Sequence, residues 1–128
     1  MIFVSKDEVL RIHARALEMF GGAAGIRDEG ALEAALVAAE NRVWYDAADI
    51  IACAATYAYH LTMADAFVDG NKRVAAATSE AFLVANDCHI EASDDELYDF
   101  FMTIASGDLS RDAADAWLRG RVRSVLTG

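Results

Sequence analysis

A short stretch near the middle of the chain, residues 64–73, combines residue types that suit phosphate chemistry. It reads A-D-A-F-V-D-G-N-K-R, in which an aspartate and a glycine stand directly before an Asn-Lys-Arg run. If a helix begins at this glycine, its first amides have no acceptor inside the helix and point at whatever lies in front. The helix dipole and the two cations favour an anion there, and glycine lets it approach the backbone closely. The predicted phosphate-binding residues are Gly70, Asn71, Lys72 and Arg73.

The aspartate before the glycine, Asp69, suits two roles at such a helix start. We expect it at the N-cap position, where its side chain would accept an amide hydrogen bond. We also expect it to hold a magnesium ion, because Mg²⁺ typically takes one or two protein carboxylates together with phosphate and water. A di- or triphosphate is the ligand that such a site prefers.

Two other interpretations of this stretch compete with the phosphate site. An ordinary capped turn followed by solvated cations has the same composition. Cations in a first helical turn are unfavourable by roughly a few tenths of a kcal/mol, which favours an anion ligand over this interpretation. A calcium loop of the EF-hand type fails, because Phe67 stands at its third position and Ala76 at its twelfth, where a bidentate glutamate is needed.

The overall charge limits the partners of the chain. Eleven lysines and arginines stand against twenty-one aspartates and glutamates, which gives a formal net charge of −10. A field of this sign repels nucleic-acid backbones and anionic lipid surfaces, so we expect neither as a partner. A small phosphate ligand is compatible with it, because a helix start with local cations can bind an anion inside a negative envelope.

Length, cysteines and hydropathy predict one cytoplasmic domain. A chain of 128 residues fits a single domain and can bury a sizeable core. Cys53 and Cys88 lack a metal-ligand spacing, so we expect reduced thiols. The N-terminus does not resemble a signal peptide, and the apolar runs end well before about 18 residues, the length that crosses a bilayer.

Helical periodicity and capping signals recur along almost the whole chain. Ser5 with Glu8 and Ser93 with Glu96 form capping boxes, and the chain has no proline. A short piece, 88–92, alternates like a brief strand. We therefore expect an all-α, compact bundle of about six helices, in which the apolar run 71–85 is the central buried helix. The expected helices cover about 5–20, 28–45, 46–63, 71–85, 93–105 and 110–123.

The segment F-V-D-G-N-K-R between two apolar helices resembles the signature of the Fic/Doc superfamily, and its Asn-Lys-Arg ending looks like the death-on-curing (Doc) branch. The segments G-I-R-D-E-G-A-L-E-A-A-L, Y-A-Y-H-L, A-F-L-V-A-N-D and I-A-S-G-D-L are similar to Doc-type sequence in the same order. The resemblance covers nearly the whole chain. It implies one domain of the helical Fic fold over residues 1–128.

The resemblance also implies a function. Fic enzymes generally transfer AMP to a protein hydroxyl, whereas Doc is a toxin and kinase that phosphorylates a threonine of elongation factor Tu. The resemblance implies ATP, or another nucleoside triphosphate, with Mg²⁺ on Asp69 and the anion at residues 70–73. Phe67 matches the aromatic that anchors the loop, and Glu40 to Asp46 falls where the family has a flap for a target peptide. No [ST]xxxE[GN] segment like the family's inhibitory helix occurs, so a separate small antitoxin would have to restrain the protein.

One position departs from the family. Asp65 stands where the family has its catalytic histidine, two residues before the phenylalanine. A carboxylate is a weaker base than imidazole and adds negative charge near a triphosphate. A loose phosphoryl transfer asks mainly for positioning, so an aspartate base is compatible with slow transfer. We expect Asp65, Lys72 and Arg73 to be the catalytic residues; AMP transfer, and an inactive protein that binds nucleotide or antitoxin, are the alternatives.

The remaining histidines and a C-terminal group of arginines have ordinary structural interpretations. His60 is expected to be a packed or surface histidine, and His13 and His89 are isolated, without ligand spacing. The C-terminal arginines are expected in the last turn of a helix, where the helix dipole favours cations. These arginines are Arg119, Arg121 and Arg123.

Overall fold

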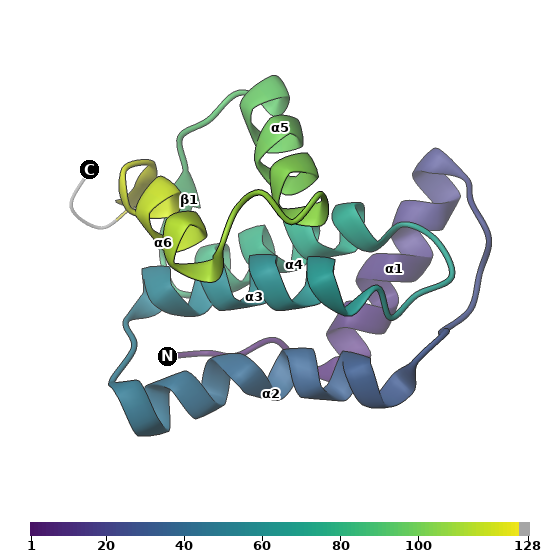
Figure 1. Cartoon of the computed structure of the whole chain (residues 1–128), viewed down its shortest axis with the longest axis horizontal. Coiled ribbons are helices and arrows are strands. Elements are labelled where there is room, and N and C mark those ends of the chain that lie inside the picture. The colour runs from purple at the N-terminus through teal and green to yellow at the C-terminus, as the bar shows by residue number, and fades with distance from the viewer. Residues whose placement is uncertain (126–128) are drawn as a thin grey trace.

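The computed structural model describes residues 1–125; the last three residues of the expected domain, 126–128, lie outside the described residues. Within this range the chain forms six helices and one small two-stranded sheet (Figure 1). The expected helical bundle is confirmed. The helices are α1 (Lys6–Phe20), α2 (Glu29–Asp46), α3 (Ile50–Ala64), α4 (Asn71–Ala85), α5 (Asp94–Ala105) and α6 (Arg111–Arg119), and the strands are β1 (Cys88–Ile90) and β2 (Val122–Ser124).

Helices α3 and α4 lie side by side in the middle of the molecule. Helix α2 runs along one side of α3, and α5 and α6 lie on the other (Figure 1). Helix α3 is the more completely buried of the central pair, because its alanines and Cys53 let neighbouring helices approach closely. Helix α4 buries one face, which includes Val74 and Phe82, and exposes Lys72 and Arg73. It therefore joins the core to a solvent-facing surface.

Side-chain caps fix the start of five of the six described helices. The capping boxes at Ser5 and Ser93 are both present, as the sequence predicts. Helix α3 begins at Ile50 under an Asp49 cap rather than at Asp46. The expected boundary is wrong because α2 continues through Asp46 and ends only where Ala47 adopts a left-handed conformation, with φ of 52°.

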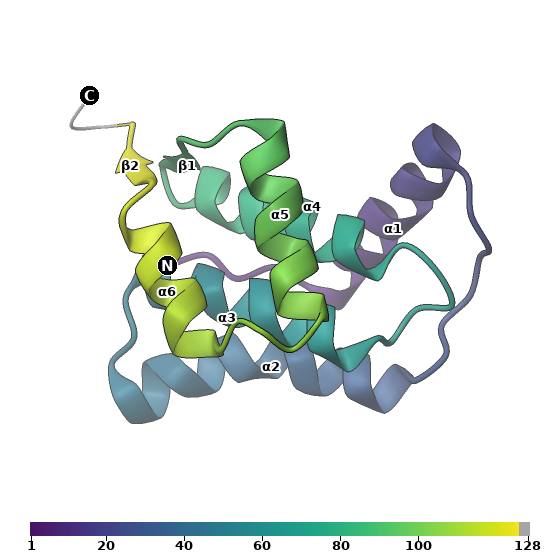
Figure 2. The same ribbon diagram turned by 45° about the horizontal axis from the view of Figure 1, so that its top comes forward.

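The C-terminal segment differs from the expected helix end. Helix α6 stops at Arg119, and residues 122–124 form β2, which pairs antiparallel with β1 (Figure 2). The brief strand at β1 is confirmed, and its partner strand is new. Arg119 lies in the last helical turn as expected, where it also pairs with Asp49. The helix-dipole interpretation is wrong for Arg121 and Arg123, which follow the helix.

The expectations for the cysteines and for membrane-spanning helices can be compared with the structure. Cys53 and Cys88 are both free, and burial raises the pKa of the Cys53 thiol to about 11. None of the helices described within residues 1–125 is both long and apolar enough to cross a bilayer.

Candidate nucleotide-phosphate site

The loop between α3 and α4, residues 65–70, is fastened to the segment that precedes α2. Ile26 and Phe67 form an isolated antiparallel bridge. The amide of Val68 donates to the carbonyl of Gly25 at 3.0 Å, and the amide of Arg27 donates to the carbonyl of Ala66 at 2.6 Å. These backbone bonds tie the loop to the segment before α2, so the start of α4 has a defined position.

Phe67 and His13 anchor the loop from below. The Phe67 ring is buried and stacks on the His13 ring, with centroids 4.0 Å apart. The Nε2 atom of His13 lies 2.9 Å from the carbonyl oxygen of Asp69. Sequence reasoning treated His13 as isolated, yet it follows Val9 by four residues. That spacing puts both on the buried face of α1, and it is the one sequence signal that could have identified His13 as a core residue.

The Asn71 side chain closes the loop on itself. Its Oδ1 accepts from the amide of Phe67 at 3.0 Å, and its Nδ2 donates to the carbonyl of Phe67 at 2.9 Å and to Oδ1 of Asp65 at 2.8 Å. The side chain therefore points back into the loop. Only the backbone amide of Asn71 remains to bind an anion.

Asp65 is held in place through both of its carboxylate oxygens. Oδ2 accepts a hydrogen bond of 2.7 Å from Nη2 of Arg27, and Oδ1 accepts the bond from Asn71. The side chains of this ion pair remain 54% exposed for Arg27 and 60% exposed for Asp65. Each carboxylate oxygen has a second lone pair, so Asp65 can still accept a proton or a hydrogen bond.

Asp69 does not occupy the expected N-cap position. The N-cap residue is Gly70, whose left-handed φ of 80° inserts one more residue before the helix and leaves α4 with no side-chain cap. Asp69 Oδ1 instead accepts from the Gly70 amide at 2.8 Å, and Oδ2 accepts from the Ala23 amide at 3.3 Å. A Cβ at Gly22 would lie 2.8 Å from that Oδ2, so glycine is needed for this close approach.

The start of α4 presents unpaired positive groups. Among residues 1–125, no acceptor is bonded to the amides of the first three helical residues, and no carboxylate lies within 4 Å of the charged nitrogens of Lys72 or Arg73. The Arg73 guanidinium lies 4.4 Å from the centroid of the Phe20 ring. In a chain with a net charge of −10, two adjacent cations without carboxylate partners favour an anionic ligand.

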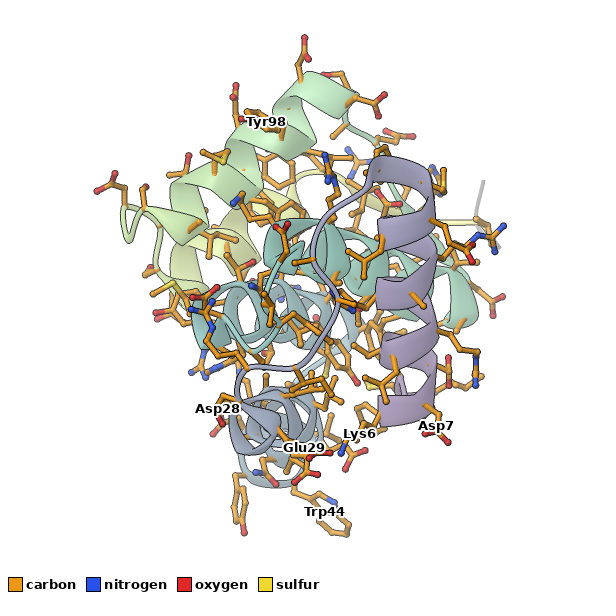
Figure 3. All side chains as sticks on the ribbon, turned by 90° about the vertical axis from the view of Figure 1, so that its right-hand side faces the viewer. Lys6, Asp7, Asp28, Glu29, Trp44 and Tyr98 are labelled. Carbon is orange, nitrogen blue, oxygen red and sulfur yellow. The ribbon has the colours of Figure 1, made fainter. Side chains whose placement is uncertain are left out.

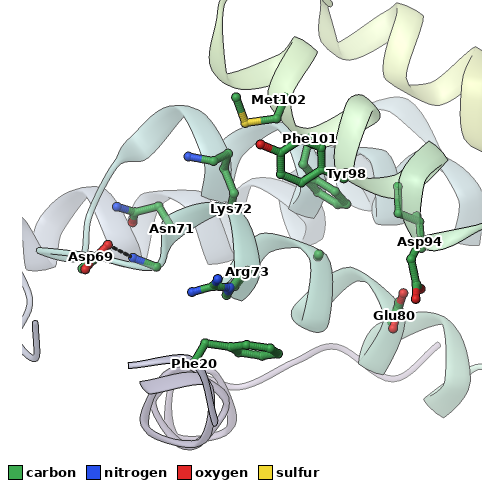
Figure 4. Close-up of a pocket in the computed structure, with 13 residues that line it drawn as sticks. Phe20, Asp69, Asn71, Lys72, Arg73, Glu80, Asp94, Tyr98, Phe101 and Met102 are labelled. Carbon is green, nitrogen blue, oxygen red and sulfur yellow. Dashed lines mark hydrogen bonds between the residues drawn. The ribbon is translucent and has the colours of Figure 1, made fainter. Parts of the chain in front are cut away.

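These groups border one pocket of about 620 Å³ between α1, α4 and α5 (Figure 4). Figure 4 shows Asp69 and Asn71 at one end, with Lys72 and Arg73 next to them. Asp65 is not part of the lining, because its carboxylate is turned to Arg27. The pocket is lined by Phe20, Asp69, Gly70, Asn71, Lys72, Arg73, Ala76, Glu80, Asp94, Leu97, Tyr98, Phe101 and Met102.

The side chains of the pocket that could bind a metal can be compared with the ligands that Mg²⁺ requires. Within residues 1–125, no three or more His, Cys, Asp or Glu side chains are grouped so that they could hold a metal alone. Asp69 is an exposed carboxylate on the pocket wall. A single carboxylate fits Mg²⁺, which completes its shell with phosphate oxygens and water, and does not fit a metal that needs an all-protein cage.

The segment expected to be the flap, Glu40 to Asp46, lies elsewhere. It forms the last turns of α2, which begins beside the loop at Glu29 and has 18 residues. A helix of that length spans about 27 Å, so Asp46 is far from the start of α4. The segment that does pair with the loop is 25–28. Trp44 projects into solvent from the far end of α2 (Figure 3).

His60 also lies outside this pocket. Its Nε2 atom is 3.5 Å from Nη1 of Arg111, and its ring is partly buried, as the sequence predicts. Burial lowers the pKa of His60, and the nearby charges of Arg111 and Arg42 lower it further. His60 and Arg111 border a separate, smaller pocket at the start of α6.

Comparison with known proteins identifies the family. Residues 3–83 match the sequence model of the Fic/DOC family, which is more than half of the chain. This chain belongs to the Fic/Doc family. It is 30% identical to the "Protein kinase doc" of Escherichia phage P1 over 93% of this chain and 94% of that protein. It is 31% identical to the "Toxin Doc" of Mycolicibacterium smegmatis over 98% of each.

The family match covers one wall of the pocket and leaves the other outside. The matched residues of this Fic/Doc chain include the whole loop and most of α4. They end before α5, which supplies Asp94, Tyr98 and Phe101 to the pocket. The match therefore includes the phosphate end and Glu80, whereas the α5 side of the pocket lies outside it.

Proposed function

We propose that this chain is a Doc-type toxin that transfers the terminal phosphoryl group of a nucleoside triphosphate to a hydroxyl group of a protein. The observation that carries the proposal is the start of α4, where free amides and two cations without carboxylate partners face a pocket. Phosphoryl transfer depends mainly on holding the phosphates and neutralising their charge. These groups provide that chemistry.

Different residues of the pocket would bind different parts of the nucleotide and its metal ion. The amides of residues 71–73 would hold phosphate oxygens in the field of the helix dipole, and Lys72 and Arg73 would pair with their charge. Asp69 would hold Mg²⁺, which when bound would neutralise charge on the phosphate oxygens. The Arg73 guanidinium is held over Phe20, so part of its ordering cost is met before the ligand arrives.

Asp65 is the proposed base for the hydroxyl nucleophile. The hydroxyl oxygen would form a bond to the terminal phosphorus while the bond from that phosphorus to the bridging oxygen breaks and a nucleoside diphosphate leaves. Asp65 would accept the hydroxyl proton on a lone pair that Arg27 and Asn71 do not use. Both partners fix the carboxylate orientation before the substrate binds.

A second candidate is a non-catalytic protein that binds nucleotide or antitoxin. It is favoured by the same two bonds to Asp65, which turn the carboxylate toward Arg27 and away from the pocket lining. In this candidate Asp65 would have a structural role, because it would tie the segment before α2 to the loop. Nucleotide binding would remain without transfer.

The names of the two relatives support partners of two kinds. One is named a toxin and the other a protein kinase. We propose a small antitoxin protein as the restraining partner and a translation protein, such as an elongation factor, as the substrate. The antitoxin would bind as a helix along the surface, which is a common way for a segment that folds on binding to engage a protein.

A label-transfer assay tests the proposed reaction. The protein is incubated with bacterial lysate and ATP labelled on either the alpha or the gamma phosphorus. Phosphoryl transfer predicts that only the gamma label enters a protein band. Entry of the alpha label would show AMP transfer instead. If neither label is transferred although calorimetry shows nucleotide binding, the non-catalytic candidate replaces the kinase.

A further inference from the structure

The end of the pocket opposite the cations is acidic. Figure 4 shows the carboxylates of Glu80 on α4 and Asp94 on α5 turned toward one another. Among residues 1–125, neither carboxylate has a lysine, arginine or histidine nitrogen within 4 Å. Burial raises the pKa of Glu80, and the charge of Asp94 raises it further. A hydrogen-bond donor placed between the two carboxylates would relieve their repulsion.

Between the two charged ends the pocket wall is aromatic. Tyr98 is 64% exposed and Phe20, on the opposite side of the pocket next to Arg73, is 59% exposed, whereas Phe101 is buried next to Tyr98 (Figure 4). Large aromatic side chains that stay exposed around a hollow suit a flat ligand that covers them. Base stacking on aromatic side chains is the common form of such an interaction in nucleotide sites.

The distance along α4 matches the length of a nucleotide. Asn71 and Glu80 are nine residues apart on one helix, which corresponds to about 13.5 Å of rise. A ribose with two or three phosphates can span such a distance. A nucleotide with its phosphates at the start of α4 therefore brings its base to the aromatic wall and the acidic end.

We propose that Glu80 and Asp94 select nucleotides whose base carries an exocyclic amino group. This inference rests on the proposed function, because it places the base of the same nucleotide. Carboxylates only accept hydrogen bonds when ionised, so they attract amino groups and repel carbonyl oxygens on the base edge. The 6-amino group of adenine and the 2-amino group of guanine both supply N–H donors. The base end would therefore be the part of the pocket that determines the donor nucleotide.

Two pairs of nucleotides test this selection by calorimetry in the presence of Mg²⁺. ATP and purine riboside triphosphate differ only in the 6-amino group, and GTP and inosine triphosphate differ only in the 2-amino group. We expect the amino group to tighten binding about ten-fold in at least one pair, as for a hydrogen bond to a charged group. The pair that shows the ratio identifies the base.

Variants of Glu80 and Asp94 show whether these two residues cause the difference in affinity within a nucleotide pair. In Glu80→Met with Asp94→Ala, the ratio is expected to fall to about one. Asp95→Ala is the control for the α5 substitution, because it removes one carboxylate from the same first turn at a residue outside the pocket lining, and it should keep the ratio. Circular dichroism of each variant checks that the helices are retained.

The outcomes separate this inference from the proposed function. Equal affinity within both pairs, or a ratio that survives the double variant, would overturn base selection by Glu80 and Asp94. If all four nucleotides still bind and Lys72→Ala with Arg73→Ala weakens them alike, the phosphate site stands. Absence of binding by every nucleotide would overturn both.

Discussion

Arg27 and Asp65 form an ion pair across the base of the loop, with Nη2 of Arg27 2.7 Å from Oδ2 of Asp65. The pair joins the segment before α2 to the first residue after α3. Asn71 binds the second oxygen of the same carboxylate. An imidazole at this position lacks the two acceptor oxygens that these contacts use. Asp65 is therefore built into the loop in a way that a histidine would not be.

The first prediction concerns the base position. Asp65→His should raise label transfer and cellular toxicity, because imidazole titrates near neutral pH and a positioned general base contributes about 10²- to 10⁴-fold in rate. Loss of the exposed pair with Arg27 should cost at most about 1 kcal/mol of folding stability. Growth arrest on induction and gamma-label transfer measure the effect.

Asp65→Ala is the control for this substitution. A parent protein that uses Asp65 as its base should lose activity on truncation, whereas an inactive parent loses nothing. A His variant that binds nucleotide normally yet stays as inactive as the Ala variant would favour the non-catalytic candidate.

The second prediction compares the contributions of Asn71 and Arg27, which both contact the loop, to folding stability. Asn71→Ala should lower the free energy of unfolding by about 1 to 3 kcal/mol, because it leaves the amide of the buried Phe67 without its acceptor and the Phe67 carbonyl with only the 3.4 Å contact from Arg27. Arg27→Ala should cost about 1 kcal/mol or less, because its ion pair is exposed. Urea denaturation of both variants checks the order, and an equal or reversed order would contradict it.

Local signals explain why the sequence predicted most helix starts. The boxes at Ser5 and Ser93 connect residues three apart, so the pattern that predicts them also contains the groups that form them. The predicted phosphate-binding residues, 70–73, also follow one another in the sequence, so a local pattern predicts them. Their placement at a helix start on a pocket agrees with the structure, and their ligand remains a proposal.

Contacts distant in sequence explain what the sequence did not show. The stacking of His13 on Phe67 joins residues more than fifty positions apart, and no local pattern contains both. Asp69 has the composition of an N-cap, but the left-handed Gly70 takes that position. The Glu40–Asp46 segment was misplaced because α2 continues through it as a helix.

The third prediction tests the phosphate end. Lys72→Ala and Arg73→Ala should each weaken nucleoside triphosphate binding by about 1.5 to 3 kcal/mol, because each removes a charge-assisted contact. The matched control is Arg11→Ala with Arg15→Ala, which removes two cations from α1 that also lack a carboxylate partner within residues 1–125 and do not line the pocket. If calorimetry gives the Lys72→Ala, Arg73→Ala double variant the same affinity as the parent and the Arg11→Ala, Arg15→Ala control, the phosphate site does not lie at this loop.

The fourth prediction concerns the antitoxin. The product of the neighbouring reading frame should co-elute with this protein after co-expression, and separate elution would contradict the pairing. The aromatic side chains of Trp44 and Tyr45, which are 85% and 84% exposed at the end of α2, are the residues to test first, because Trp and Tyr are enriched at binding hot spots. Replacing both with Ala should weaken co-elution, whereas replacing the exposed Val84 on α4 should not.

The fifth prediction is a pH dependence of stability that comes from His60. Burial, the charge of Arg111 and the charge of Arg42 lower the pKa of His60 below its ordinary value of 6.5. As the pH falls through 6.5, the unfolded chain therefore takes up a proton that the folded chain does not. The free energy of unfolding should decrease over this range, and the loss should be complete once the pH lies below the lowered pKa.

The variant His60→Gln tests this prediction, because Gln keeps a polar side chain opposite Arg111 and does not titrate. The difference in stability between the parent and His60→Gln should change in favour of the variant from pH 7.5 to 5. His89→Gln, at an exposed ring, is the control. A pH-independent difference for His60→Gln in urea denaturation would show that His60 does not couple protonation to folding.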